Sequence, residues 1–342
     1  MRVAFILPSN AKAAPNVVAS LLIKQLVKSN IVVDLFVFKF SEVDRELPFE
    51  IKPVLLNFKF EFSNYDIVHS MGFKPDLFVF MNKMLGKIGS CKIVTTIHSD
   101  VKKDLIDLYG FCRGFFFSTL WRCASCKFDA RIFLNNIQMS NFGFHSKYLI
   151  NRVIPNAVEL SDYKFSWQVK MKNIVLYCGA LRDIKGVDIA LNSVRFSNLF
   201  NLDVVGDGSK RSVRRYHDIV KQNDIEGRVR FLGHSSDVNT LLSKYKIIIV
   251  PSRSEGFGLI ILEAIYSGLY VICNDIPELR SLFNNFPVFF YKENDAKSLA
   301  LVIEKILDLP DIRSVDNFFK EKFAPDIMGR AYINVYKELA AE

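Results

Sequence analysis

The sequence predicts an α/β protein made of two doubly wound, parallel-sheet domains of the Rossmann type, facing one another across a cleft. Three observations support this prediction. Short apolar runs rich in Val and Ile alternate with segments of helical periodicity. Most of these runs are apolar throughout, as strands buried on both faces are. The alternating series occurs twice, and 342 residues are enough for two domains.

The first series starts at the amino terminus. Met1–Leu7 is too short for a signal peptide and runs into Pro8, so it indicates a first strand. A helix is expected at Asn16–Ser29. The expected strands of this half are Val3–Leu7, Val32–Phe38, Ile67–Ser70, Lys92–Ile97, Ala130–Leu134 and Arg152–Ile154.

The second series has the same alternation. Helices are expected at Val187–Ser193, Lys210–Asn223 and Ser298–Leu307. The expected strands are Ile174–Cys178, Leu202–Val205, Val229–Phe231, Ile247–Val250, Tyr270–Cys273 and Val288–Phe290. Between the two series, Pro155-Asn156 and a polar stretch up to Lys172 predict a linker. We therefore expect domains at 1–160 and 161–324, and a helix at 325–342 that crosses back to the first domain.

The formal net charge of +9 calls for an anionic partner, such as phosphate groups or an anionic lipid surface. Neither zinc-finger spacing nor RNP-like aromatic strands occur, so nucleic acid is not an expected partner. No uncharged apolar run reaches eighteen residues, so no transmembrane helix is expected. The six cysteines indicate reduced thiols in the cytoplasm, and Cys123-Ala-Ser-Cys126 is interpreted as part of a helical core rather than a metal site.

One apolar stretch, Ser252–Gly268 (S-R-S-E-G-F-G-L-I-I-L-E-A-I-Y-S-G), contains two glutamates, Glu255 and Glu263. Burying an unpaired carboxylate is costly, so at least one of them is expected to have a function. Ser252 or Ser254 is expected to cap a helix whose start, lined by glycines, presents free N–H groups to a phosphate. The alternative is that Glu255 caps the helix and Glu263 reaches solvent.

Three other expected strands end in turns of similar character. Tyr177–Asp188 (Y-C-G-A-L-R-D-I-K-G-V-D) places Arg182 and Lys185 where they can meet an anion. Val204–Ser209 (V-V-G-D-G-S) and Arg228–Gly233 (R-V-R-F-L-G) also end in glycine-containing turns. A glycine after a strand is common in α/β proteins, so each turn alone is a weak signal.

In this order, however, the motifs G-x-L-x-x-x-K-G-x-D, V-G-D-G, V-x-F-L-G, P-S-x-x-E-G-F-G-x-x-x-x-E-A and I-P-E resemble the retaining glycosyltransferases of family 4, with their E-x7-E element. The resemblance covers Tyr177–Glu278, and Ile154–Glu159 (I-P-N-A-V-E) is similar to the interdomain segment of the family. It implies the GT-B fold. The N-terminal half matches in layout and in Thr96–Asp100 (T-I-H-S-D).

The resemblance also implies residue roles. Lys185 and the N–H groups near Gly258, Leu259 and Ile260 would hold the diphosphate of a nucleotide sugar. Glu255 would accept hydroxyls of the transferred sugar and Glu263 those of the ribose, while His98 would contact the sugar near the reacting carbon. The implied catalytic residues are thus His98, Glu255 and Lys185. The implied donor-binding residues are Gly179, Arg182, Lys185, Gly206, Ser252, Glu255, Gly256, Phe257, Gly258, Leu259, Ile260 and Glu263.

The sequence departs from the family pattern at two places. Ala180 stands where the family often has arginine, and Arg182 is the candidate replacement. The first strand-to-helix turn lacks the usual glycines; Ser9, Asn10 and Asn16 are its candidate acceptor-binding residues. No D-x-D motif occurs, so neither a metal nor another cofactor is expected.

Gly110–Phe128 (G-F-C-R-G-F-F-F-S-T-L-W-R-C-A-S-C-K-F) interleaves aromatic residues with Arg113, Arg122 and Lys127. This pattern favours an interfacial helix on an anionic membrane, and the alternative is that its aromatics form core. Together these observations predict a cytoplasmic, peripherally membrane-bound enzyme. It would transfer a hexose or N-acetylhexosamine from a UDP- or GDP-sugar to a lipid-linked glycan in O-antigen, lipopolysaccharide or capsule synthesis. The alternatives are a sugar-nucleotide epimerase or hydrolase, and a catalytically idle binding subunit.

Overall fold

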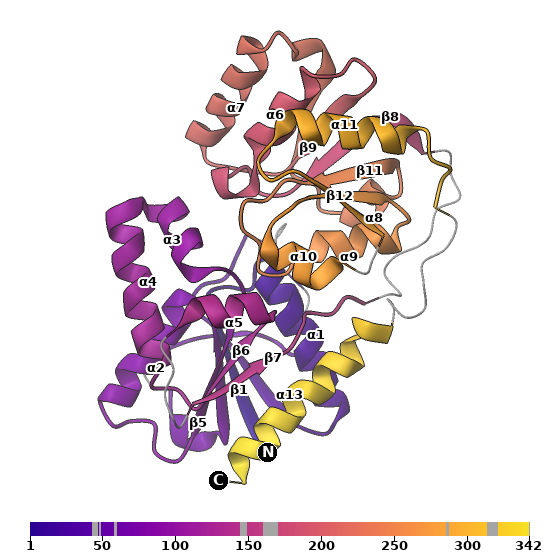
Figure 1. Cartoon of the computed structure of the whole chain (residues 1–342). Helices are drawn as coiled ribbons and strands as arrows, with labels where there is room; N and C mark the ends of the chain where they lie inside the picture. The colour runs from indigo at the N-terminus through magenta and orange to yellow at the C-terminus, as the bar shows by residue number, and fades with distance from the viewer. Residues whose placement is uncertain are drawn as a thin grey trace. The chain divides into compact units, whose positions relative to one another are not determined.

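The structure is a computed structural model that describes residues 1–42, 47, 49–57, 60–143, 149–159, 170–284, 287–312 and 321–341. The chain forms two compact units (Figure 1). Unit 1 consists of Met1–Glu159 and Glu321–Glu342, and unit 2 of Leu160–Lys320. Within the described ranges, no helix combines the length and apolar character needed to cross a bilayer.

Unit 1 contains a seven-stranded sheet in the order β3-β2-β1-β4-β5-β6-β7. All its pairings are parallel, and strands that follow one another in the chain are joined through a helix or a long loop, as parallel pairing requires. The strands are β1 Arg2–Leu7, β2 Val32–Val37, β3 Val54–Leu55, β4 Ile67–Met71, β5 Lys92–Ile97, β6 Ala130–Phe133 and β7 Ile150–Val153. The helices are α1 Ala14–Lys28, α2 Phe73–Met84, α3 Val101–Tyr109, α4 Phe111–Ser125, α5 Asn136–Phe142 and α13 Pro325–Ala340.

Unit 2 contains a six-stranded parallel sheet in the order β10-β9-β8-β11-β12-β13. Its strands are β8 Met171–Cys178, β9 Asn201–Val205, β10 Val229–Gly233, β11 Tyr245–Val250, β12 Tyr270–Asn274 and β13 Val288–Tyr291. Its helices are α6 Val187–Val194, α7 Lys210–Gln222, α8 Val238–Leu242, α9 Leu259–Tyr266, α10 Pro277–Phe283 and α11 Ala296–Leu307. The predicted α/β class with two doubly wound parallel sheets is therefore confirmed.

The strands agree with the expected ones to within a few residues, because most contain a short apolar run. The exception is β3, which has only two residues in the brief run Val54–Leu56. Most of the predicted linker up to Lys172 lies outside the described residues.

A buried carboxylate ties together the elements of unit 1. Asp76, in the first turn of α2, accepts hydrogen bonds from Ser70 Oγ of β4 (2.5 Å), Thr95 Oγ1 of β5 (2.8 Å) and Trp121 Nε1 of α4 (2.6 Å). Burial raises its pKa to about 7, although the three hydrogen bonds act in the opposite direction. The contact with Trp121 fixes α4 to the sheet.

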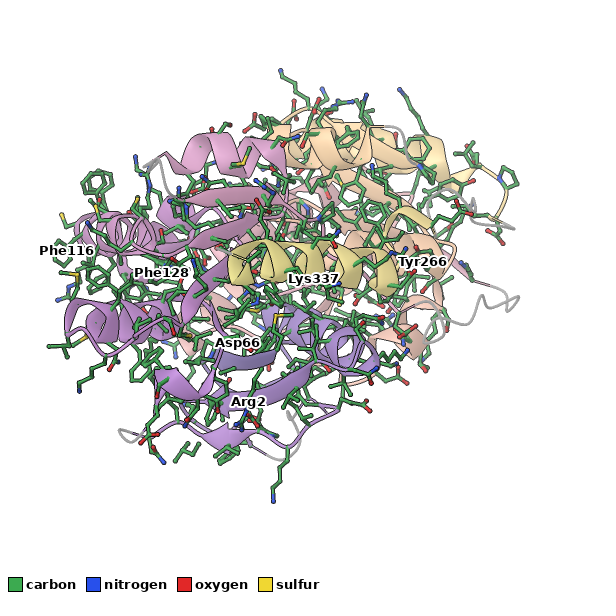
Figure 2. All side chains as sticks on the ribbon, turned by 90° about the horizontal axis from the view of Figure 1, so that it is seen from below. Arg2, Asp66, Phe116, Phe128, Tyr266 and Lys337 are labelled. Carbon is green, nitrogen blue, oxygen red and sulfur yellow. The ribbon has the colours of Figure 1, made fainter. Side chains whose placement is uncertain are left out.

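Helix α4 has two kinds of aromatic residue. Trp121 is 6% exposed and belongs to the core, whereas Phe111 is 71% and Phe116 63% exposed. Figure 2 shows Phe116 at the periphery. The alternative that these aromatics form core is therefore correct for Trp121 and wrong for Phe116, and the interfacial helix stays a prediction. We call the exposed apolar side chains where α3 meets α4 the α3–α4 corner: Leu108, Tyr109, Phe111, Phe115 and Phe116.

Helix α13, drawn in yellow in Figure 1, returns to unit 1 and packs beside α1. Two of its tyrosines reach a buried polar pair in the sheet. Tyr336 Oη lies 2.6 Å from His69 Nδ1, whose Nε2 lies 2.8 Å from Thr96 Oγ1, and Tyr332 Oη lies 3.0 Å from the same Thr96 oxygen. Burial, and to a lesser extent electrostatic interaction with His98, lowers the pKa of His69 to about 3, so the imidazole is neutral at ordinary pH.

We predict that His69 makes the stability of unit 1 depend on pH. Unfolded histidine has a pKa of about 6.5, so below that pH His69 binds a proton in the unfolded chain but not in the folded chain. The contribution of neutral His69 to the free energy of unfolding is complete above about pH 6.5. It is lost as the pH falls toward 3, by up to about 1.4 kcal/mol per pH unit. Urea unfolding of the wild type and of His69→Gln between pH 7 and 4 measures this difference. A difference that does not change with pH would contradict it.

Candidate functional site

The candidate site is formed by the loops that follow β8 and β11 in unit 2. These strands are neighbours in a parallel sheet, so their carboxyl ends lie at the same edge. The first loop contains a short 3-10 helix, Asp183–Lys185, and the second leads into α9. The chain thus brings Lys185 and Glu255 together from positions 70 residues apart.

Lys185 and Glu255 form an ion pair. Lys185 Nζ lies 2.7 Å from Glu255 Oε2, and the hydroxyl of Ser252 donates to the same oxygen at 3.1 Å. The side chains are 29% and 14% exposed, so both groups remain accessible to a ligand while they neutralise each other. Glu255 does not cap α9, because no side chain among the described residues caps this helix. The alternative in which Glu255 serves as a helix cap is therefore excluded.

The backbones of the two loops are in close contact at Gly186. This residue has φ +68° and a Cβ built on it would lie 2.0 Å from the carbonyl oxygen of Pro251. Only glycine allows both the left-handed conformation and this approach. Arg253 N also donates to Ile184 O at 2.8 Å. The main chain thus brings the two loops that carry Lys185 and Glu255 into contact.

Helix α9 begins at Leu259 with its first N–H groups open. Its N-cap is Gly258, with φ +83°, and among the described residues no side chain caps the helix. The expectation that Ser252 or Ser254 caps it is wrong, because the loop continues to Gly258 and the Ser252 hydroxyl is used by Glu255. The N–H groups of Leu259 and Ile260 have no acceptor within the helix and carry a partial positive charge. Because Glu255 Cγ would lie 3.5 Å from a Cβ at Gly258, the ion pair adjoins this helix end.

The second glutamate of the motif, Glu263, lies on α9 and is partly buried. Burial and then the charge of Glu263 raise the pKa of Cys178 at the end of β8 to about 12, so Glu263 lies near that strand end. A helix end with free N–H groups, a lysine and two carboxylates can bind a phosphate and accept hydroxyl groups.

The remaining predicted donor-binding residues lie in or near the loops of unit 2, and they differ in burial and in the hydrogen bonds that they make. Gly179 N donates to Val205 O at 2.9 Å and Gly206 N to Gly233 O at 2.8 Å, so these two N–H groups extend the sheet. Phe257 is buried against Phe283, with ring centroids 6.1 Å apart, and Gly256 is also buried. Arg182 precedes the 3-10 helix and is partly buried.

His98 follows β5 in unit 1. Its Nε2 atom is buried and has no hydrogen-bond partner among the described residues. Burial lowers its pKa to about 4, so the imidazole is neutral at ordinary pH. A neutral histidine with an unsatisfied nitrogen can donate to or accept from a ligand hydroxyl.

The three predicted acceptor-binding residues lie in the loop after β1. Asn16 Nδ2 donates to the carbonyl oxygens of Ser9 (2.9 Å) and Ala11 (2.8 Å), and Asn10 Oδ1 accepts from Ser41 N (2.7 Å) and Oγ (3.0 Å). Both amides stabilise the loop. Their role toward an acceptor stays a prediction, as does that of Ser9.

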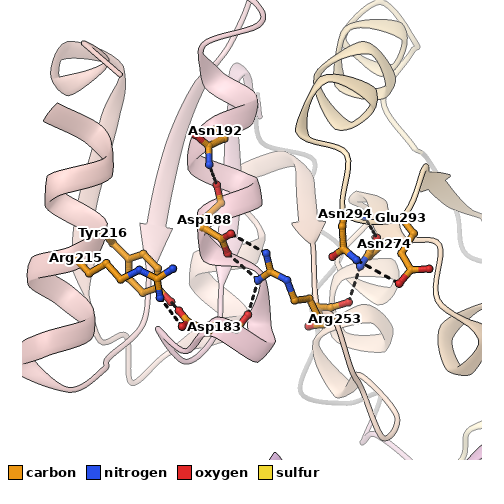
Figure 3. Close-up of polar contacts among 10 residues, drawn as sticks. Asp183, Asp188, Asn192, Arg215, Tyr216, Arg253, Asn274, Glu293 and Asn294 are labelled. Atoms are coloured by element: carbon orange, nitrogen blue, oxygen red, sulfur yellow. Dashed lines mark hydrogen bonds and ion pairs between the residues drawn. The ribbon is translucent and has the colours of Figure 1, made fainter. Parts of the chain in front are cut away.

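Two residues of the site were missed as functional candidates from the sequence. Arg253 and Asp188 form a bidentate ion pair between the two loops, with distances of 2.8 and 2.7 Å (Figure 3). The available signal was their position: Asp188 follows Lys185 by three residues and Arg253 precedes Glu255 by two.

The chain is similar to known proteins both in sequence and in fold. Residues 161–319 match the family model for glycosyl transferases group 1. The match covers nearly all of unit 2. Over the full chain, the O-antigen biosynthesis glycosyltransferase WclY of Escherichia coli is 26% identical over 359 aligned residues, which cover 100% of this chain and 99% of WclY. The group 1 domain and this relative confirm the predicted glycosyltransferase.

Two solved structures have the same fold as this glycosyltransferase. Sucrose-phosphate synthase from Thermosynechococcus elongatus has a TM-score of 0.80 at 19% identity, with 100% of this chain and 99% of that chain covered. HepE from Anabaena, solved with UDP and glucose, has a TM-score of 0.76 at 15% identity, with 98% and 99% covered. The predicted GT-B fold is therefore confirmed.

We predict that Gly186→Ala destabilises unit 2 by at least about 2 kcal/mol, because a left-handed alanine is strained and its Cβ meets the Pro251 carbonyl. The matched control is Gly227→Ala, where a Cβ has nothing within 4 Å and φ is not positive. Thermal unfolding of both variants measures the difference. Equal stability of the two would contradict the close contact between the loops.

Proposed function

We propose that the enzyme is a retaining, metal-independent glycosyltransferase acting on a nucleotide-diphosphate sugar. The acceptor is a lipid-linked glycan of a bacterial surface polysaccharide. The observation that carries the proposal is the Lys185–Glu255 pair, 2.7 Å apart, beside the open N-terminus of α9. At this position, groups that can bind an anion lie beside a carboxylate that can accept hydrogen bonds from sugar hydroxyls.

The donor would bind through its diphosphate. As the glycosidic bond of the donor breaks, negative charge grows on the leaving phosphate oxygen, and fixed N–H dipoles with a lysine stabilise that charge. Lys185 and the N–H groups of Leu259 and Ile260 supply these donors, which is why no metal is invoked. Glu263 would accept the ribose hydroxyls. HepE, whose structure holds UDP and glucose, supports a uridine diphosphate sugar, with a guanosine diphosphate sugar as the alternative.

The transferred hexose or N-acetylhexosamine would be held by Glu255 and by His98. Neutral His98, with its unsatisfied Nε2, would bond a sugar hydroxyl near the reacting carbon. Departure and attack on one face of the sugar, without a covalent intermediate, would retain the configuration.

The acceptor assignment is supported by WclY, which is named for O-antigen biosynthesis. The α3–α4 corner supports a membrane location for the reaction. Its rings contact one another, with centroids of Phe111 and Phe115 6.3 Å apart, and Lys102 Nζ lies 5.5 Å from the ring of Phe115. Exposed aromatics beside exposed Lys102, Lys103 and Arg113 suit the headgroup region of an anionic bilayer. The enzyme would then work peripherally on the cytoplasmic face.

We predict that Glu263→Ala mainly raises the KM for the donor, whereas Lys185→Ala also lowers kcat, by about 100-fold, because Lys185 stabilises charge that develops in the transition state. Steady-state kinetics with labelled UDP- and GDP-sugars and lipid extract measure both effects. Unchanged kinetics in both folded variants would contradict the site assignment. Release of free sugar and nucleotide without acceptor would instead indicate a hydrolase or epimerase.

We predict that Phe111→Ser with Phe116→Ser weakens binding to vesicles that contain phosphatidylglycerol, because two exposed rings no longer enter the interface. Co-sedimentation measures the bound fraction. The control is Phe196→Ser, which removes an aromatic ring that is 46% exposed in unit 2. Equal binding of wild type, double variant and control would remove the α3–α4 corner from the proposal.

A further inference from the structure

A second ion pair joins the two loops of the donor site. Arg253 lies in the loop after β11, two residues before Glu255, and Asp188 lies in the first turn of α6, three residues after Lys185. Arg253 Nη1 donates to Asp188 Oδ1 at 2.8 Å and Nη2 to Oδ2 at 2.7 Å, while Nη1 also donates to Asp183 O at 2.6 Å. Figure 3 shows this guanidinium between the two loops.

Each loop is also held on its outer side. Asp183, at the start of the 3-10 helix that contains Lys185, pairs with Arg215 and accepts from Tyr216 Oη at 2.8 Å, and both of these residues belong to α7. In the other loop, Asn274 Nδ2 of β12 donates to Ser252 O at 3.1 Å. Arg253 therefore adds a bidentate side-chain connection between two loops that are already in backbone contact and are each fixed to their neighbours.

The two ion pairs between the loops differ in whether a bound donor would compete with them. Lys185 and Glu255 are the groups assigned to the diphosphate and to the sugar hydroxyls, so the bond between them competes with the donor. In the proposed function Arg253 and Asp188 contact no ligand, and their bond does not compete. Its fork of two parallel hydrogen bonds also fixes orientation, which a single lysine–carboxylate contact does not.

We propose that Arg253 and Asp188 are positioning residues that keep Lys185 and Glu255 at binding distance when the donor takes over their mutual contact. This inference rests on the proposed donor site. It assigns to Arg253 a role that depends on its guanidinium geometry, beyond its charge.

The test compares Arg253→Lys with Arg230→Lys in the full-length enzyme. Arg230 is a matched control because it makes a bidentate pair of the same kind, 2.7 Å to each oxygen of Asp203, between β10 and β9 rather than between the site loops. We expect Arg253→Lys to raise the Kd for UDP about tenfold and to lower kcat several-fold, since two charged hydrogen bonds lose their geometry. The Tm of the two variants should be similar and the control kinetics unchanged.

A second measurement removes both partners. If Arg253 and Asp188 act as a unit, Arg253→Met combined with Asp188→Asn should bind UDP no more weakly than the worse single variant. Donor affinity and kcat of Arg253→Lys equal to those of Arg230→Lys would overturn the proposal. The proposal would also be overturned if the losses of UDP-binding free energy in the two single variants added up in the double variant.

Hydrogen exchange of the ligand-free proteins separates this inference from the proposed function. Faster exchange of the amides in 183–188 and 252–258 of Arg253→Lys, but not of Arg230→Lys, would support the positioning role even if the wild type bound no nucleotide sugar. In that case only the proposed function would fail. Unchanged exchange, together with wild-type donor binding by Arg253→Lys, would reject the positioning role alone.

Discussion

The contact between Lys185 and Glu255 is the interaction on which the account of this glycosyltransferase depends. Two opposite charges, partly shielded from solvent, lie 2.7 Å apart beside a helix end whose N–H groups are open. An unpaired carboxylate in such an apolar segment would be costly, and the lysine removes that cost while no ligand is bound. The pair thus explains how the protein can keep the groups of the proposed donor site in place without losing stability.

The parallel sheet of unit 2 makes this contact possible. Strands β8 and β11 are neighbours, so their loops meet at one edge although their sequences are far apart. Gly186 lets the two backbones touch, and Arg253 joins them through side chains. In unit 1, buried polar contacts attach helices to the sheet. Asp76 fixes α4, and the His69–Tyr336 contact fixes α13. In both units, then, buried polar contacts hold specific segments in place on an apolar parallel sheet.

The fold was predictable because most of its parallel strands are buried and contain short runs of Val, Ile, Leu or Phe, which show in the sequence. Strand β3 was not, since it has only two residues. Within the site, Lys185, Glu255 and Glu263 were found from motif order. The expected serine cap was wrong, because capping by Ser252 or Ser254 is the local preference, whereas Gly258 is the actual N-cap and the Ser252 hydroxyl bonds Glu255. The contact between Arg253 and Asp188 joins positions 65 residues apart, so their nearness in sequence to Glu255 and Lys185 was the one local signal for it.

The central prediction is that the pyrophosphate of an activated sugar lies at the Leu259 end of α9. A crystal structure of the enzyme with an intact uridine diphosphate sugar tests it most directly. We expect phosphate oxygens within hydrogen-bond distance of the Leu259 and Ile260 amides and of Lys185 Nζ, with Glu255 bonded to a sugar hydroxyl and no longer to Lys185. A nucleotide sugar bound elsewhere, with the Lys185–Glu255 contact unchanged, would contradict it.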